Sequence, residues 1–260
     1  MPRPPPTPKE LVGLTQNVLT LAFWALVGAD HAGYVAVIDE EYKEFGFCVA
    51  ETTFQSGFGN SFELCFIIDL LAFLLILCRS RTREHVGYGS TVFVHGGFHF
   101  LQFLYGYKPL ETWPPFLSLV TYTLFTVVYL GGFGVGFKVG SMRTLALATA
   151  IIVGAAHTCI PDAFGFAFTN TWIYTTATLV AVNSPKSARS LGSSWAATLM
   201  FLGGALVPFC EAMLCNHGFK ALGGHAVFDA TIAIAMLAAV EGSTRPSRGE
   251  LHASPKIRNE

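Results

Sequence analysis

The sequence predicts an all-α polytopic membrane protein, a bundle of seven core helices preceded by one N-terminal helix. Composition is the first reason. Of the 260 residues, 52% are hydrophobic and 13% are charged, and the mean hydropathy is +0.49. About a quarter of the residues of an average soluble domain are charged. The second reason is that the apolar residues form long runs, each able to cross the hydrocarbon core of a bilayer as a helix.

Eight segments of about 20 predominantly apolar residues follow one another along the chain. The connections between them are short, except for residues 30–60. We expect membrane-spanning helices at residues 11–29, 61–78, 90–107, 115–136, 143–160, 165–182, 194–214 and 222–241. Together they make a single helix bundle over residues 11–241.

The two ends differ from the bundle in composition. Residues 1–10 are rich in proline, and residues 242–260 are polar and charged, so we expect both to be disordered. The first apolar segment has two interpretations. It ends in the small residues Val27-Gly28-Ala29, which resemble a signal-peptidase site, so it is either a cleaved signal peptide or a retained extra helix. Its length and the prolines before it favour retention.

The basic residues predict which side of the membrane each connection faces. If the N-terminus is cytoplasmic, all but three of the 16 Lys and Arg residues fall on the cytoplasmic side. The exceptions are Lys43, Lys108 and Lys220. We therefore expect a multi-pass protein with a cytoplasmic C-terminus. The net charge of −1 gives no reason to expect a nucleic-acid partner.

Six cysteines occur without the paired spacing of a zinc ribbon. Three of them, Cys48, Cys159 and Cys215, fall on or near the non-cytoplasmic side. A disulfide between two of them is possible if that compartment is oxidising. Buried free thiols are the alternative, and the sequence leaves the pairing open.

Ionisable side chains within membrane spans are costly and tend to mark function. Most of those in this chain lie near helix ends, where water and headgroups are within reach. We interpret Asp69 and Glu211 as polar links between helices.

Two pairs of side chains are harder to explain in this way. His95 and His99 lie four residues apart in the segment 90–107, and His225 and Asp229 repeat this spacing. Residues at i and i+4 share one face of a helix. Imidazole nitrogens with a carboxylate oxygen make a zinc ligand set. The two pairs therefore indicate either a shared metal site or interhelical His–Asp hydrogen bonds.

The order of these residues resembles the CREST superfamily, which joins alkaline ceramidases with the progestin and adipoQ receptors. Its members are seven-helix membrane proteins, and many are zinc-dependent amide hydrolases. The superfamily opens its first core helix with an acidic residue and Asn and Ser positions, and residues 58–61 are similar. Its second core helix carries Ser-x-x-x-His, where this chain has His95-Gly-Gly-Phe-His99.

The resemblance extends to the later helices. Glu111 stands near the position of an Asp in the superfamily, and His225-x-x-x-Asp229 takes the place of His-x-x-x-His. Within the superfamily, residues 48–241 are most similar to the transmembrane protein 187 family, on features that include Leu110-Glu111-Thr112-Trp113. This chain departs from the pattern at three positions: His95 stands in place of Ser, Glu111 in place of Asp, and Asp229 in place of His.

The resemblance implies a function as well as a fold. His99, His225 and Asp229 would be the metal ligands, and Glu111 would be a fourth ligand or a general base, with His95 as the other candidate base. Zinc acidifies a water molecule for hydrolysis. The expected substrate is a lipid amide or ester that enters from the bilayer.

Two other classes of protein remain open at this stage. The first is a lipid receptor or membrane scaffold, in which the metal site is structural or degenerate. The second is a proton or ion transporter, which we consider less favoured because glycine interruptions occur in the segment 115–136 without a counterpart elsewhere.

Overall fold

The structure is a computed structural model of the chain. It describes residues 8–45, 48, 61–105, 114–136, 144, 147–152, 155, 173, 176 and 206–244. Helix is the only regular secondary structure in these ranges, which confirms the all-α class for this part of the chain. Most residues of the predicted helices at 143–160, 165–182 and 194–214 lie outside the described ranges.

Five long helices fall close to predicted spans. The apolar runs end where charged or turn residues begin, so the helix ends were largely set by composition. These helices are α1 Pro8–His31, α3 Ser61–Arg79, α4 Arg83–Tyr105, α6 Pro115–Gly136 and α11 Ala226–Thr244.

Two features of the chain order differ from the prediction. A short helix, α2 Glu40–Phe45, lies inside the expected connection, with glutamates in its first turn and Lys43 in its last, as the helix dipole favours. The last span begins at Ala226 rather than residue 222, because Gly223 and Gly224 adopt positive φ angles of 117° and 56° and end the preceding turn.

The region before α11 is a bent assembly of short helices. It consists of α10 Val207–Leu214, the π-helix η2 Cys215–Phe219 and the 3₁₀-helix η3 Lys220–Leu222. Non-helical backbone at His217 and Gly218 breaks the helical path inside η2. This kink delivers the chain to the start of α11.

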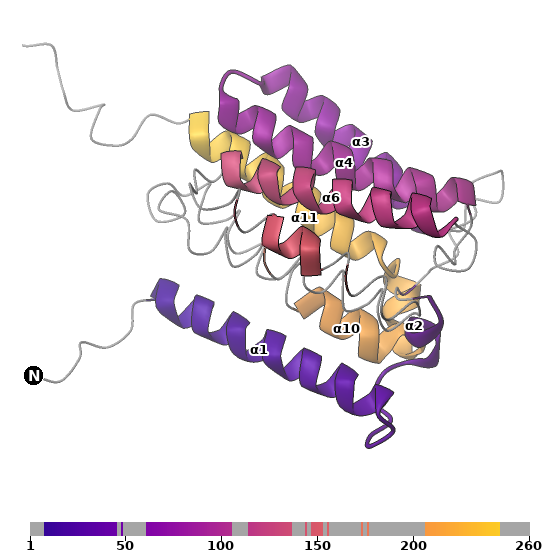
Figure 1. Ribbon diagram of the computed structural model, residues 1–260. Helices are drawn as coiled ribbons and strands as arrows, with labels where there is room; N and C mark the ends of the chain where they lie inside the picture. Colours follow the sequence, from indigo (N-terminus) through magenta and orange to yellow (C-terminus); the bar gives the residue numbers. More distant parts are fainter. Residues whose placement is uncertain are drawn as a thin grey trace, which may run out of the picture.

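The core forms where α4 packs between α3 and α6, and α11 packs across α3 and α4 (Figure 1). Aromatic side chains fill the space between these helices, and several of them are fully buried. The largest are Tyr88, Phe125, Tyr129 and Phe228.

Glycine allows α4 to approach its neighbours closely. A Cβ on Gly87 of α4 would lie 2.6 Å from the backbone oxygen of Gly132 in α6. A Cβ on Gly96 would lie 2.7 Å from the Cβ of Asp69 in α3. Small residues at helix contacts are a common device of membrane helix packing. Gly132 and Gly136 of α6 therefore serve helix packing, because a Cβ on either would clash with α4.

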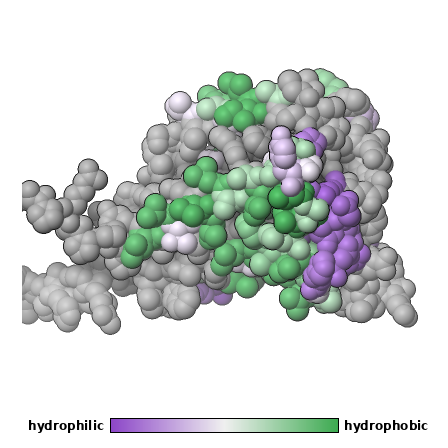
Figure 2. Space-filling model, turned by 90° about the horizontal axis from the view of Figure 1, so that it is seen from below, coloured by the Kyte–Doolittle hydropathy of each residue, from purple (hydrophilic) through white to green (hydrophobic). Residues whose placement is uncertain are grey.

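The N-terminal helix is attached to the rest at its C-terminal end. Phe23 of α1 packs in a small core with Tyr42 of α2 and Ala212 of α10. Asp30 accepts hydrogen bonds from the backbone N–H groups of Val37 and Ile38 at 2.6 and 2.8 Å. Along α1, Figure 2 shows apolar side chains on the surface, and hydrophilic residues at the α2 end.

Within the described residues, one helical segment is long and apolar enough to cross a membrane, Leu119–Gly136 of α6. A second crossing exists if Phe209–Leu222 and Ala226–Glu241, bent by 81°, are one broken span. The structure thus supports one or two of the eight predicted spans by length and composition alone.

Candidate metal centre

Four side chains from two helices and the residue before α11 meet in the core. His95 and His99 lie one turn apart on α4, Asp229 lies in the first turn of α11, and His225 directly precedes that helix. Each offers one ligand atom, and these atoms all lie within 4.8 Å of one another. All four residues are buried. This group can hold a metal ion.

The Asp229 carboxylate is the centre of the group. Its Oδ1 lies 3.2 Å from Nδ1 of His95 and 3.3 Å from Nε2 of His99. Ligand atoms around a tetrahedral zinc ion, at about 2.0–2.1 Å from the metal, are about 3.3 Å apart. The 3.3 Å between Oδ1 of Asp229 and Nε2 of His99, two of the expected ligands, therefore fits adjacent corners of a zinc coordination shell.

A second carboxylate, Asp69 of α3, adjoins the group. Its Oδ2 lies 2.8 Å from Nδ1 of His95, and its side chain is fully buried. Gly96 has no side chain to separate the two helices, so Asp69 comes close to α4. The sequence analysis treated Asp69 only as an interhelical link. Its position in the middle of an apolar helix was the signal for a larger role.

A third carboxylate, Glu211 of α10, contacts the opposite edge of the group. Its Oε1 lies 2.8 Å from Nδ1 of His225 and is also 2.8 Å from the backbone nitrogen of Cys48, which donates to it. Metal-binding histidines commonly donate their second ring N–H to a carboxylate in this way. Sequence reasoning missed this role because Glu211 and His225 are separated by the kinked segment.

Aromatic rings enclose the group on the core side. The rings of Phe125, Tyr129 and Phe228 have their centroids within 5.7–6.0 Å of the His95 ring. An apolar wall of this kind limits access of water and strengthens electrostatic interactions inside the site.

The predicted site residues are thus brought together in large part. The expected ligands His99, His225 and Asp229 lie together in the core, and His95 joins them. Glu111, the predicted fourth ligand or general base, lies outside the described residues. The role of His95 in proton transfer stays a prediction.

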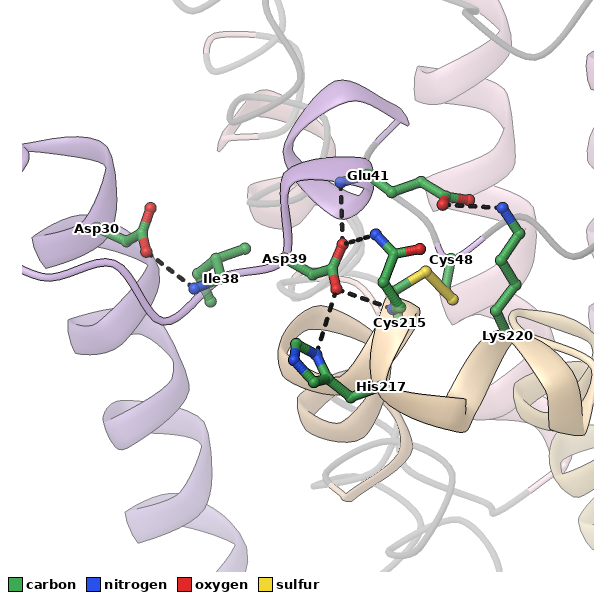
Figure 3. A network of polar contacts seen from close by, with 9 residues as sticks. Asp30, Ile38, Asp39, Glu41, Cys48, Cys215, His217 and Lys220 are labelled. Carbon is green, nitrogen blue, oxygen red and sulfur yellow. Dashed lines mark hydrogen bonds and ion pairs between the residues drawn. A yellow bond between two sulfur atoms is a disulfide. The ribbon is translucent and has the colours of Figure 1, made fainter.

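The open question of cysteine pairing is settled for two of the six cysteines. Cys48 and Cys215 form a disulfide (Figure 3). Cys65, Cys78 and Cys210 are free thiols. Next to the disulfide, Asp39 accepts hydrogen bonds from Asn216 and from the backbone N–H of Glu41. This polar network joins the chain before α2 to the kink after α10.

In the part of the chain that the structure describes, these features define an all-helical fold with a buried His/Asp group that can hold a metal ion. Comparisons of the chain with protein-family models, with curated proteins and with solved structures found no match in any of the three.

Proposed function

We propose that the chain is a multi-pass membrane protein that holds zinc at His99, His225 and Asp229 and hydrolyses a lipid amide or ester. The observation that carries the proposal is the convergence of these three side chains with His95 and Asp69 in a buried core. The membrane location, the metal and the reaction each have separate support.

The membrane location is supported by a reversal of the usual distribution of polarity. Large apolar side chains are exposed on the outer faces of α3, α4 and α6, whereas charged and polar side chains are buried between these helices. Soluble monomers rarely expose contiguous apolar surface of this extent. On α3 alone, the exposed large apolar residues are Leu70, Leu71, Leu74, Leu75 and Leu77.

The ends of the bundle also agree with the proposed topology. Arg79 at the end of α3 pairs with Glu241 near the end of α11 at 3.1 Å. Gly136 at the end of α6 accepts a hydrogen bond from Tyr88 in the first turns of α4. The ends of α3, α6 and α11 and the start of α4 therefore lie at one end of the bundle. All four border connections that are assigned to the cytoplasmic side.

Zinc is supported by the charge of the site. Asp69, Asp229 and Glu211 bring three carboxylates into the core, and no Lys or Arg is buried among the described residues. Buried carboxylates are costly unless a positive partner lies close by. A divalent cation among three imidazoles satisfies this requirement, and the mixed nitrogen and oxygen ligands suit zinc.

The proposed reaction assigns separate tasks to the two histidines of α4. When bound, zinc supplies Lewis acidity that activates water for hydrolysis. His99 holds the ion, and His95, oriented by Asp69, accepts the proton from the attacking water and returns it to the leaving group. Glu111 remains a second candidate for this proton transfer. We expect the apolar chain of the substrate to enter from the bilayer.

Metal content of the detergent-purified protein tests the proposal. We expect about one zinc ion per chain in the wild type. His99→Ala and His225→Ala should each abolish it, because a site with three protein ligands loses one of them. His85→Ala is the matched control: His85 is a buried histidine of the same helix that accepts a hydrogen bond from the backbone N–H of Arg81.

The outcomes separate the alternatives. Zinc lost from the two site variants and retained in His85→Ala supports the centre, and hydrolysis of lipid amides or esters by the wild type then supports the enzyme. Zinc without hydrolysis would favour a receptor or scaffold. A folded wild type without metal would refute the zinc centre.

A further inference from the structure

His225 is held at its backbone by Cys48 and at its side chain by Glu211. Its backbone N–H donates to the carbonyl oxygen of Cys48 at 2.8 Å. The backbone N–H of Cys48 in turn donates to Oε1 of Glu211, and the same oxygen lies 2.8 Å from Nδ1 of His225. Cys48, Glu211 and His225 therefore form a closed ring of contacts.

The oxygen at the centre of this ring determines the tautomer of the imidazole. Oε1 of Glu211 accepts a hydrogen bond from a backbone N–H, so it acts as an acceptor. A carboxylate has no hydrogen to donate, so Nδ1 of His225 at the same oxygen carries the proton and donates it. In a neutral imidazole the other nitrogen, Nε2, is unprotonated, and only an unprotonated nitrogen binds a metal ion.

The disulfide attaches this ring to α10. Cys215 follows the end of α10 and lies four residues after Glu211 in the chain. The disulfide joins Cys215, which follows α10, to Cys48. Cys48 donates a hydrogen bond to Glu211 of α10, so the disulfide holds the donor close to its acceptor. Both residues of the disulfide are fully buried. Figure 3 shows the bond beside the Asp39 contacts that join the same two segments.

We propose that Glu211, held in place by the Cys48–Cys215 disulfide, is a positioning residue that fixes the Nδ1–H tautomer of His225 and so sets the metal affinity of the site. The metal part of this inference rests on the proposed function, and the tautomer part does not. Glu211 itself contacts His225 and Cys48, and acts on a metal ion only through His225.

The first test is the tautomer of His225 in the metal-free protein. The ¹⁵N chemical shifts of histidine-labelled protein distinguish the two neutral tautomers, and the His225 signals are those missing from His225→Ala. We expect the Nδ1–H form in the wild type and in Glu211→Gln, whose amide oxygen can accept both hydrogen bonds. Glu211→Ala should show a mixture. Asp30→Asn, which alters another buried carboxylate bonded to backbone N–H groups, should not change the signals.

The second test is zinc affinity, measured by competition with a chelator. Loss of a carboxylate that orients a metal-binding histidine typically costs about 10–100-fold in affinity. We expect a loss in that range for Glu211→Ala, a smaller one for Glu211→Gln, and a loss for Cys215→Ser towards the lower end of the range. Cys78→Ser removes an exposed free thiol and should leave zinc affinity unchanged.

The two tests distinguish failure of this inference from failure of the proposed function. An Nε2–H tautomer in the wild type, or an unchanged tautomer in Glu211→Ala, would overturn the positioning role. Unchanged zinc affinity in Glu211→Ala would overturn it while leaving the zinc centre standing. A wild type that shows the Nδ1–H tautomer, lost in Glu211→Ala, but binds no zinc would retain the positioning role and refute the centre.

Discussion

Asp229 occupies a position where a carboxylate and an imidazole would have different consequences. As Asp, it places an oxygen 3.2–3.3 Å from nitrogen atoms of both His95 and His99. A carboxylate adds negative charge to the coordination shell, which makes a bound metal a weaker Lewis acid than three imidazoles would. Residue 229 is therefore the side chain that most directly sets the chemistry of the centre.

We predict that Asp229→His retains zinc whereas Asp229→Ala loses it. Imidazole nitrogen is a good zinc ligand, but the methyl group of alanine supplies none. Zinc affinity should fall further in Asp229→Ala than the loss of about 10–100-fold that is typical when a residue outside the ligand shell is changed. Chelator competition measures both. Equal affinity of the alanine variant and the wild type would contradict the assignment of Asp229 as a ligand.

At the scale of elements, the faces of α4 have distinct tasks. One face of α4 carries His95 and His99. Gly96 lets α4 approach α3, and Gly87 lets it approach α6. Consecutive glycines, Gly96 and Gly97, sit between the two histidines. A Cβ on Gly96 would clash with Asp69, but one on Gly97 would meet nothing within 4 Å. The close approach of α3 to the centre therefore depends on one of the two.

Gly96→Ala and Gly97→Ala make a matched pair of substitutions. We expect Gly96→Ala to lower the free energy of unfolding by about 1–3 kcal/mol, the usual cost of overpacking, and to weaken zinc binding by displacing Asp69 from His95. Gly97→Ala should stabilise the helix by up to about 1 kcal/mol, because alanine favours helix over glycine. Thermal unfolding in detergent measures both, and equal effects would contradict the tight α3–α4 contact.

We expect the stability of the connection between α1 and α2 to depend on pH. Burial opposes ionisation of the Asp30 carboxyl, but hydrogen bonds from Ile38, Lys43 and Val37 and the charge of Lys43 together lower its pKa. A lowered pKa means that Asp30 stabilises the fold fully above its ordinary value of about 3.9 and loses this contribution as the pH falls through the folded-state pKa.

We predict that Asp30→Asn is less stable than the wild type at pH 6 and that the difference shrinks progressively below about pH 4. Asparagine removes the charge that Lys43 pairs with at 2.6 Å. Melting temperatures of the two proteins between pH 3 and pH 7 measure the difference. A gap that grows on acidification would contradict the lowered pKa of Asp30.

At the scale of the whole molecule, the two ends of the bundle have different compositions. One end gathers Arg79, Arg81 and Arg83 beside the end of α11, which carries Glu241. The other end carries α2, the disulfide and the kink before α11, and its ion pairs include Lys43–Asp30 and Lys220–Glu41. A disulfide forms in an oxidising compartment, which is consistent with a non-cytoplasmic location for this second end.

Cysteine labelling tests this orientation. In sealed vesicles with the cytoplasmic side outward, a membrane-impermeant maleimide should label Arg81→Cys directly and label Glu40→Cys only after detergent is added. Both substituted positions are exposed, and both variants are made with Cys78→Ser so that this exposed free thiol does not contribute. Immediate labelling of Glu40→Cys would reverse the proposed topology.

The sequence alone determined the helices and one set of site residues. Long apolar runs locate α3 and α6 within a few residues, because a helix that faces an apolar environment needs continuous apolar composition. The helix expected from residue 90 begins earlier, at Arg83, because its first turns are polar and give no apolar signal. The i,i+4 spacing places His95 beside His99 whatever the surrounding fold. It also placed Asp229 one turn after His225, before anything was known of their neighbours.

Only the tertiary structure decided which distant residues join this set. Asp69 reaches His95 because Gly96 allows two helices to approach, and Glu211 reaches His225 across the kink at Gly218. The pairing of Cys48 with Cys215 bridges 167 residues. Spacing along one helix fixes neighbours because the helix is regular, but contacts between helices depend on how whole segments pack, and no local pattern encodes them.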